Sequence, residues 1–264
     1  MKRVALGDVE LAVVDRGQGV PLLLVHGFPL DHSMWSGQLE GLSDSCRIIA
    51  PDLRGFGQSD VTEGTVTMAQ MADDLVALLN GLGVDEPVVF CGLSMGGYVG
   101  WEFFRRHRDR LRGLVLCDTR AICDTPEVAQ GRRDTANKVV EEGLAVLVDG
   151  MVPKLFSEAT VANRPEIVEQ TREVMMSTAR EGIAAAARGM AERIDATSTL
   201  PGIDCPTLVV VGEEDAISTV EEMRGFAERI PNARFVEIKG AGHMSPLENP
   251  TAVNVAIRGF VDGL

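Results

Sequence analysis

The sequence predicts an α/β fold in which a mostly parallel sheet carries helices on both faces and is interrupted by a helical insertion. Short apolar runs alternate with amphipathic helical patterns in the first half of the chain and again near its end. Strands joined by crossover helices produce this alternation. Between residues 120 and 199 the strand-like runs disappear, and Ala, Glu, Arg and Met dominate at helical spacing. We therefore predict a core of residues 1–119 and 200–264 and a helical cap at residues 120–199.

The individual elements follow from apolar runs and from helix-start signals. The expected strands are Val9–Asp15, Pro21–Val25, Arg47–Ala50, Pro87–Cys91, Leu114–Cys117, Thr207–Val211 and Arg234–Ile238. Thr67 with Gln70 three residues later forms a capping box and predicts a helix that ends near Gly81. Further helices are expected from Met95 to His107, after a cap at Ser218, and from Asn249-Pro250. Within the insertion, weak breaks near Gly143, Pro153 and Gly182 predict three or four helices.

Composition excludes several classes of protein. The 264 residues are enough for one large domain with its own core, which needs no disulfide or metal to fold. The net charge of -14 repels nucleic acid and anionic membranes, so neither is an expected partner. The chain reaches Asp8 before any apolar segment forms, and no apolar run approaches the length of a membrane span. We therefore expect no signal peptide and no membrane helix.

The five cysteines are odd in number and scattered, without a C-x-x-C pair. Cys46, Cys91 and Cys117 lie in or beside apolar runs, which favours small buried side chains over disulfides or metal ligands. The four histidines are far apart in the sequence, so we expect no metal site. These features together predict a reduced, cytoplasmic protein.

The strongest chemical signal is Gly92-Leu93-Ser94-Met95-Gly96-Gly97, between an expected strand and an expected helix. A G-x-S-x-G pattern at such a junction forces the serine into a sharp, strained turn that presents its hydroxyl group. Ser94 is therefore our candidate nucleophile. The alternative interpretation is a tight turn that holds a serine by chance.

A serine hydroxyl needs a base, and the base needs a carboxylate to orient it. His243 follows the strand Arg234–Ile238 on a glycine-rich loop, and Asp215 follows the strand Thr207–Val211. Both positions are at carboxyl ends of strands, the edge where Ser94 is expected, and the order Ser, Asp, His fits this geometry.

Other histidines and acids compete for these roles. His26 ends an inner strand and is expected to brace a loop, whereas His32 and His107 fall in or near helices and are expected to be solvated or packed. Asp118, after the preceding strand, is the competing acid.

A pocket that stabilises a negatively charged oxygen is the third expected part of the site. Gly27 in the run Val25-His26-Gly27-Phe28-Pro29 lets the backbone turn so that the Phe28 N–H can face the substrate. With the Met95 N–H at the start of the following helix, it would form a two-donor oxyanion hole.

Taken together, these motifs and the run Asp52–Ser59 resemble the α/β-hydrolase superfamily over essentially the whole chain. Within it, the segment from His26 to Trp35, the serine motif with Tyr98, and Leu116–Arg120 are similar to small bacterial carboxylesterases close to 3-oxoadipate enol-lactonases. The resemblance implies hydrolysis of short-chain carboxylic esters by a Ser-His-Asp acyl-enzyme mechanism, with a small-molecule ester as the partner and no cofactor. Haloalkane dehalogenases and epoxide hydrolases of this fold carry an aspartate where this chain has Ser94, which points to acyl transfer instead.

Leu30 and Met244 follow the oxyanion loop and the candidate base, so both side chains are expected to line the acyl pocket. The alternative function is a lactonase resembling 3-oxoadipate enol-lactonase. Its dicarboxylate-like substrate would need a cation, for which Arg120 is the candidate, although a surface salt bridge is the simpler role. An esterase for carrier-protein-bound acyl chains is disfavoured by the acidic cap, and a non-catalytic receptor stays open. The sequence leaves the number of subunits open.

Overall fold

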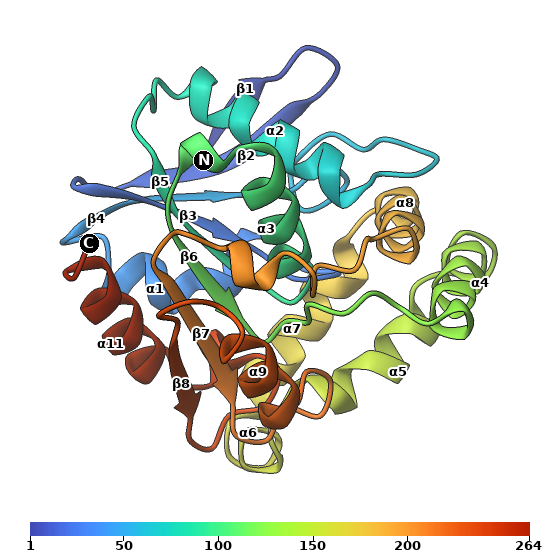
Figure 1. Ribbon diagram of the computed structural model, residues 1–264. Coiled ribbons are helices and arrows are strands. Elements are labelled where there is room, and N and C mark those ends of the chain that lie inside the picture. Colours follow the sequence, from blue (N-terminus) through green and yellow to red (C-terminus); the bar gives the residue numbers. More distant parts are fainter.

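A computed structural model describes all residues, 1–264, and contains one eight-stranded sheet in the order β1-β2-β4-β3-β5-β6-β7-β8 (Figure 1). β1 and β2 are antiparallel to their neighbours, and every other pair is parallel. The strands are β1 (Lys2–Ala5), β2 (Glu10–Arg16), β3 (Val20–Val25), β4 (Cys46–Pro51), β5 (Val88–Leu93), β6 (Leu111–Cys117), β7 (Thr207–Gly212) and β8 (Arg234–Ile238). All seven expected strands are present; β1, at the edge of the sheet, was not expected.

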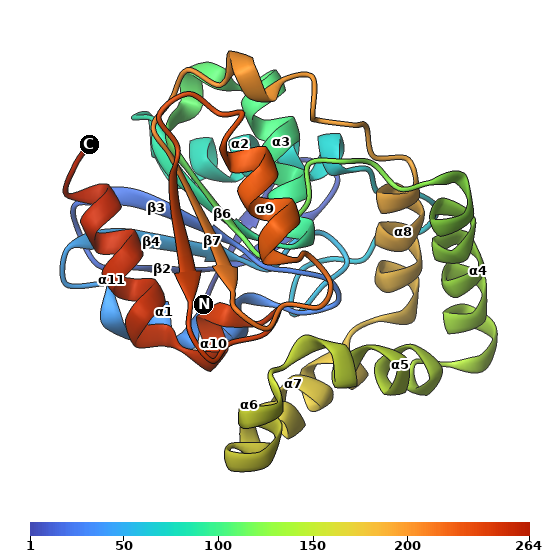
Figure 2. The same ribbon diagram turned by 60° about the horizontal axis from the view of Figure 1, so that its bottom comes forward.

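Helices cover both faces of this sheet. The helices α2, α3 and α9 pack on one face, and α1, α10 and α11 lie on the other (Figures 1 and 2). The core helices are α1 (Ser36–Gly41), α2 (Met68–Gly81), α3 (Met95–Arg106), α9 (Val220–Ala227), α10 (Ser245–Glu248) and α11 (Pro250–Val261), with 3₁₀ turns at His32–Trp35, Arg108–Arg110 and Leu200–Gly202. No helix combines the length and the apolar character that crossing a bilayer requires.

Helix caps explain where several of these helices begin. The Thr67 hydroxyl accepts the Gln70 N–H and opens α2, as the capping box predicts. At α9 the expected cap was wrong by one residue, because Thr219, and not Ser218, accepts the Glu222 N–H. The Ser218 hydroxyl donates instead to a carboxylate at the candidate site. The pattern offered two adjacent hydroxyls, and only the tertiary structure distinguishes them.

Five helices stand between β6 and β7, where three or four were expected. They are α4 (Pro126–Glu142), α5 (Ala145–Leu155), α6 (Glu158–Asn163), α7 (Pro165–Ser177) and α8 (Arg180–Ala191). Gly143 ends α4 as expected, and Pro153 lies in the last turn of α5. Gly182 does not end a helix, contrary to expectation, since it lies inside α8. In Figure 2, α8 and α4 run side by side, and α5, α6 and α7 form the far end of the cap.

Gly182 serves a close approach between the cap and the core. A methyl group on Gly182 would overlap the carbonyl oxygen of Gly55, and one on Gly189 would overlap that of Val66. Between them, the Val66 N–H donates to the Ala185 carbonyl at 3.1 Å. We call this contact of α8 with residues 55–66 the glycine seam. It brings helix and loop together backbone to backbone.

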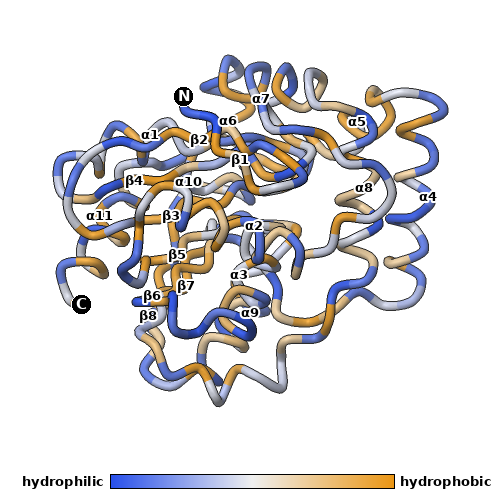
Figure 3. Tube along the Cα trace, turned by 90° about the horizontal axis from the view of Figure 1, so that it is seen from above, coloured by the Kyte–Doolittle hydropathy of each residue, from blue (hydrophilic) through white to orange (hydrophobic).

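Burial follows the hydrophobic pattern of the sequence. The strands β3, β5 and β7 are buried along nearly their whole length, and the central sheet is coloured hydrophobic in Figure 3, whereas much of α4 is hydrophilic. Cys46, Cys91 and Cys117 are buried and free, as expected for small core side chains. An apolar sheet with both faces covered therefore forms the rigid support from whose carboxyl edge the candidate residues extend.

Candidate active site

Ser94 occupies the strained turn that the sequence predicts. It follows β5 and precedes α3. Its backbone has φ of 53° and ψ of -110°, a conformation that residues other than glycine rarely adopt. The turn is tight, and it needs glycine at position 96. A methyl group there would lie 3.0 Å from the His26 carbonyl oxygen and closer still to that of Val25. Ser94 itself is partly exposed. The hydroxyl-bearing turn is thus held at the sheet edge by its backbone.

Asp215 and His243 meet at the same edge, although they are 28 positions apart in the chain. Asp215 Oδ2 lies 2.9 Å from His243 Nδ1, and both residues are buried. Burial acts to raise the pKa of Asp215. The charge of His243 and the hydrogen bonds that the Asp215 carboxylate accepts nevertheless hold this pKa below its ordinary value. Ser94 Oγ makes no hydrogen bond to His243 in this structure; such bonds commonly tighten only when substrate is bound.

Ser218 is a member of this cluster that the sequence did not reveal. Its hydroxyl donates to Asp215 Oδ2 at 2.6 Å and lies 3.4 Å from His243 Nδ1. The N–H groups of Ile217 and Ser218 both donate to Asp215 Oδ1. The carboxylate is therefore fixed by three bonds from its own loop before the imidazole is counted. A Ser three residues after an Asp is a turn signal that could have suggested this role.

The loop expected to form the oxyanion hole lies beside Ser94. A methyl group on Gly27 would be 3.4 Å from Ser94 Cβ, and the Phe28 N–H donates to no acceptor within the protein. Met95 is the first residue of α3, so its N–H has no partner inside the helix. The Phe28–Pro29 peptide bond is cis. Two unpaired donors thus stand on the elements that flank the serine.

The competing residues have structural partners instead. His26 is buried and accepts the Leu53 N–H at 2.9 Å, so it braces a loop as expected, and burial lowers its pKa. Asp118 accepts the Gly212 N–H and the Ser245 hydroxyl. Burial and the charge of Asp215 raise the pKa of Asp118 well above its usual range. Asp118 makes no hydrogen bond to His243, whereas Asp215 lies 2.9 Å from His243 Nδ1, which favours Asp215 as the residue that orients the imidazole.

His32 and His107 are not simply solvated or packed, which corrects the expectation for both. His107 Nε2 lies 2.7 Å from Asp73, and His32 Nδ1 lies 2.6 Å from Asp52. The pairs are 34 and 20 positions apart, a separation at which sequence gives no signal.

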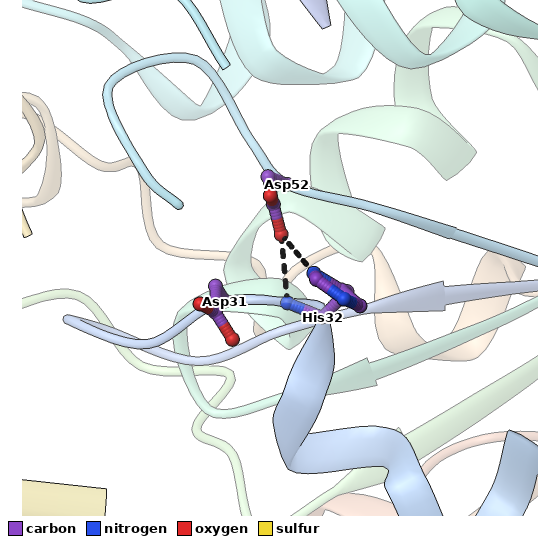
Figure 4. A group of neighbouring side chains, drawn as sticks. All are labelled: Asp31, His32 and Asp52. Atoms are coloured by element: carbon purple, nitrogen blue, oxygen red, sulfur yellow. Dashed lines mark hydrogen bonds and ion pairs between the residues drawn. The ribbon is translucent and has the colours of Figure 1, made fainter. Parts of the chain in front are cut away.

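Asp31, His32 and Asp52 form the one cluster with the composition of a metal site, and their ligand atoms lie within 4.8 Å of one another (Figure 4). Asp52 accepts both the backbone N–H and the Nδ1 of His32, as drawn, and also the Gln58 N–H. Asp31 caps the following 3₁₀ turn through Ser33. Hydrogen bonds within the protein therefore engage both oxygens of Asp52 and Oδ1 of Asp31.

Leu30 and Met244, the two expected pocket residues, have different surroundings. Leu30 lines a pocket of about 650 Å³ between α7 and the first core helices, together with Met34, Ile167 and Leu247. Met244 is fully buried and, like Ser94 and His243, is not among the residues that line this pocket. Arg120 pairs with Glu222 at 2.8 Å, the surface salt bridge considered above.

The fold is that of a hydrolase family. A family model for the alpha/beta hydrolase fold matches residues 20–250, and the chain belongs to this family. The expected fold is thereby confirmed.

The proteins to which this chain is similar include esterases and enol-lactonases. A solved thermophilic esterase from Thermogutta terrifontis, with malate bound, is 50% identical, with a TM-score of 0.97 over 99% of this chain and 98% of that one. The enol-lactonase from Burkholderia xenovorans LB400 is 31% identical, with a TM-score of 0.92 over 99% of this chain and all of its own. 3-oxoadipate enol-lactonase 1 of Acinetobacter baylyi is 30% identical over 89% of this chain and 85% of its own length.

Proposed function

We propose that this protein is a carboxylesterase that hydrolyses short-chain carboxylic esters through Ser94, His243 and Asp215. The observation that carries the proposal is the buried Asp215–His243 pair at the edge where Ser94 is presented in a strained turn. Similarity to the esterase of Thermogutta terrifontis over almost the full length supports the ester class.

In the proposed mechanism, Ser94 Oγ attacks the ester carbonyl carbon while His243 takes the hydroxyl proton. The Phe28 and Met95 N–H groups bind the resulting oxyanion, and His243 returns the proton to the departing alcohol. Water then attacks the acyl-enzyme with the same base, which releases the acid and restores the serine. Asp215 holds the imidazole throughout and stabilises its charged form.

The direct test is covalent labelling of the nucleophile. A sulfonyl fluoride should label Ser94 with one equivalent, and Ser94→Ala should lose nearly all turnover of p-nitrophenyl acetate with an unchanged melting temperature. Persistent turnover by the alanine variant, or labelling of another residue, would contradict the assignment. One bound ester per chain without turnover would identify a receptor instead.

The length of the acyl group tests the proposed pocket. If Leu30 and Met244 limit the space near Ser94, wild type should prefer acetyl to butyryl esters. Leu30→Ala and Met244→Ala should move the optimum towards hexanoyl esters, because each added methylene that is buried is worth about 0.8 kcal/mol. The measurement is kcat/KM on C2 to C8 p-nitrophenyl esters. A uniform slowing of all lengths would instead reflect damage to the fold.

A lactonase is the second candidate, favoured by the enol-lactonases among the relatives. A ring ester with a free carboxylate requires a cation in the pocket, and Arg120 is already paired with Glu222. We therefore rank simple esters above dicarboxylate-like lactones. Parallel assays of aliphatic lactones and p-nitrophenyl esters decide between them.

A further inference from the structure

Glu248 is a buried carboxylate to which the proposed mechanism assigns no role. It is the last residue of α10, five positions after His243, and is 3% exposed. Its Oε1 accepts the N–H groups of Gly242 at 2.8 Å and Met244 at 3.3 Å, the two neighbours of His243. Its Oε2 accepts the Ser157 N–H at 2.8 Å, from the cap. One side chain therefore binds the loop of the candidate base and the cap at once.

Further contacts join the same two segments. The Met244 N–H also donates to the Leu155 carbonyl at 3.1 Å, and the Ser157 hydroxyl donates to the Gly240 carbonyl at 3.1 Å. A methyl group on Gly242 would lie 2.7 Å from the Ser157 nitrogen, so the approach requires glycine there. We call this contact of residues 155–157 with residues 240–244 the base-loop junction.

Only a carboxylate fits this position. Donors approach from two sides, and each of the two oxygens of Glu248 accepts on one side. A glutamine of the same size has a single acceptor oxygen and would turn its NH₂ group towards an N–H on the other side. A buried N–H without an acceptor is unfavourable, so one half of the junction would separate or shift.

We propose that Glu248 is a positioning residue for the hydrolysis proposed above. It acts through His243 by fixing residues 240–244 to residues 155–157 of the cap. The position of the imidazole relative to Ser94 therefore depends on how the cap packs against this loop. Glu248 touches neither the substrate nor the reacting atoms in this arrangement. The inference rests on the proposed function, because it requires that His243 act as the base.

The first test is Glu248→Gln, assayed on p-nitrophenyl acetate. We expect kcat to fall about 10- to 100-fold, the effect of misplacing a catalytic group by a fraction of an ångström to an ångström, with KM changed less than about threefold. Asp74→Asn is the matched control: Asp74, on α2, is also a buried carboxylate, but it binds Arg54 and makes no hydrogen bond to residues 240–244. It should lower the melting temperature and leave kcat within about twofold. An unchanged kcat in Glu248→Gln, or an equal loss of kcat in both variants, would overturn the proposal.

A second pair of variants tests the junction from the cap side and does not depend on Glu248→Gln folding. Ser157 has φ of -64° and the preceding Phe156 is extended, so proline suits the backbone angles at 157, and its ring carbon replaces the N–H hydrogen that points at Glu248 Oε2. Ser157→Ala removes the hydroxyl but keeps the N–H that Glu248 binds, whereas Ser157→Pro removes both. We expect kcat to fall about tenfold further in the proline variant than in the alanine variant, since only proline frees Oε2 from the cap. Equal kcat values would show that the bond to the cap does not position the base.

The wild-type protein separates a failure of this inference from a failure of the proposed function. If a sulfonyl fluoride labels Ser94 and esters turn over, the variants test Glu248 alone. If wild type is neither labelled nor active, the proposed function is wrong, and the inference is overturned together with it.

Discussion

Two of the contacts between the cap and the core are built by different physical means. At the glycine seam, Gly182 and Gly189 of α8 let two backbones touch because side chains are absent. At the base-loop junction and around Asp215, buried carboxylates accept N–H and O–H groups and hold loops by directional bonds. One contact depends on shape and the other on hydrogen bonds and charge.

Because of this difference, a substitution at the glycine seam should change stability, whereas a substitution at the base-loop junction should change catalysis. A group added at the glycine seam has no room, so the cost appears in the free energy of unfolding and slows no particular chemical step. A bond removed at the carboxyl edge leaves the packing in place but releases a reacting group. Substitutions in the two regions should therefore give distinct signatures, and the three predictions below test that contrast.

The largest expected effect is at the glycine seam. Gly182→Ala places a methyl group on the Gly55 carbonyl and should lower the free energy of unfolding by about 3 kcal/mol, as over-packing does. Gly131→Ala in α4 is the control, because a methyl group there meets nothing within 4 Å and should stabilise the helix by about 0.5–1 kcal/mol. Urea denaturation of both variants measures the difference. Similar values for the two would show that α8 can move away from the core.

A smaller effect is expected from the adjacent hydroxyls at the start of α9. Ser218→Ala removes a bond to Asp215, and kcat should fall about tenfold, equivalent to about 1.4 kcal/mol. Thr219→Ala removes the helix cap and should cost about 1 kcal/mol of stability with kcat unchanged. Ester kinetics and thermal melting on both variants test the contrast. The reverse pattern would restore the sequence-based assignment of Ser218 as the cap.

The smallest effect concerns pH. The hydrogen bond from His32 to Asp52 raises the pKa of His32 in the folded protein. A raised folded pKa stabilises the protein fully below the unfolded value of about 6.5, and this contribution is lost as pH rises through the folded pKa. The stability advantage of wild type over His32→Gln should therefore shrink as the pH rises above about 6.5, by less than about 1 kcal/mol. Urea midpoints measured at a series of pH values below and above this point test it.

The same series in Gly182→Ala should show a deficit independent of pH, since the added methyl group meets only backbone atoms of Gly55. A pH-dependent deficit there, or a constant one in His32→Gln, would remove the distinction between the two regions.

The sequence by itself determined the α/β class and all but one of the strands. It also singled out Ser94, Asp215 and His243 as candidate residues at the carboxyl ends of strands. Apolar periodicity and turn residues are local signals, and parallel strands necessarily bring their carboxyl ends to one edge. The insertion of the cap was equally visible, because strand-like runs stop at Asp118 and resume at Thr207.

Only the tertiary structure decided which neighbours these residues meet. Ser245 and Glu248 bind residues that a different strand or the cap brings to them, and no spacing in the chain encodes such a meeting. Gly182 looked like a helix break because glycine is flexible, yet it serves a contact with Gly55, more than a hundred positions away. The pairs His32–Asp52 and His107–Asp73 were missed for the same reason. Local sequence sets the backbone path, but hydrogen bonds and close packing between distant segments depend on where those paths meet in space.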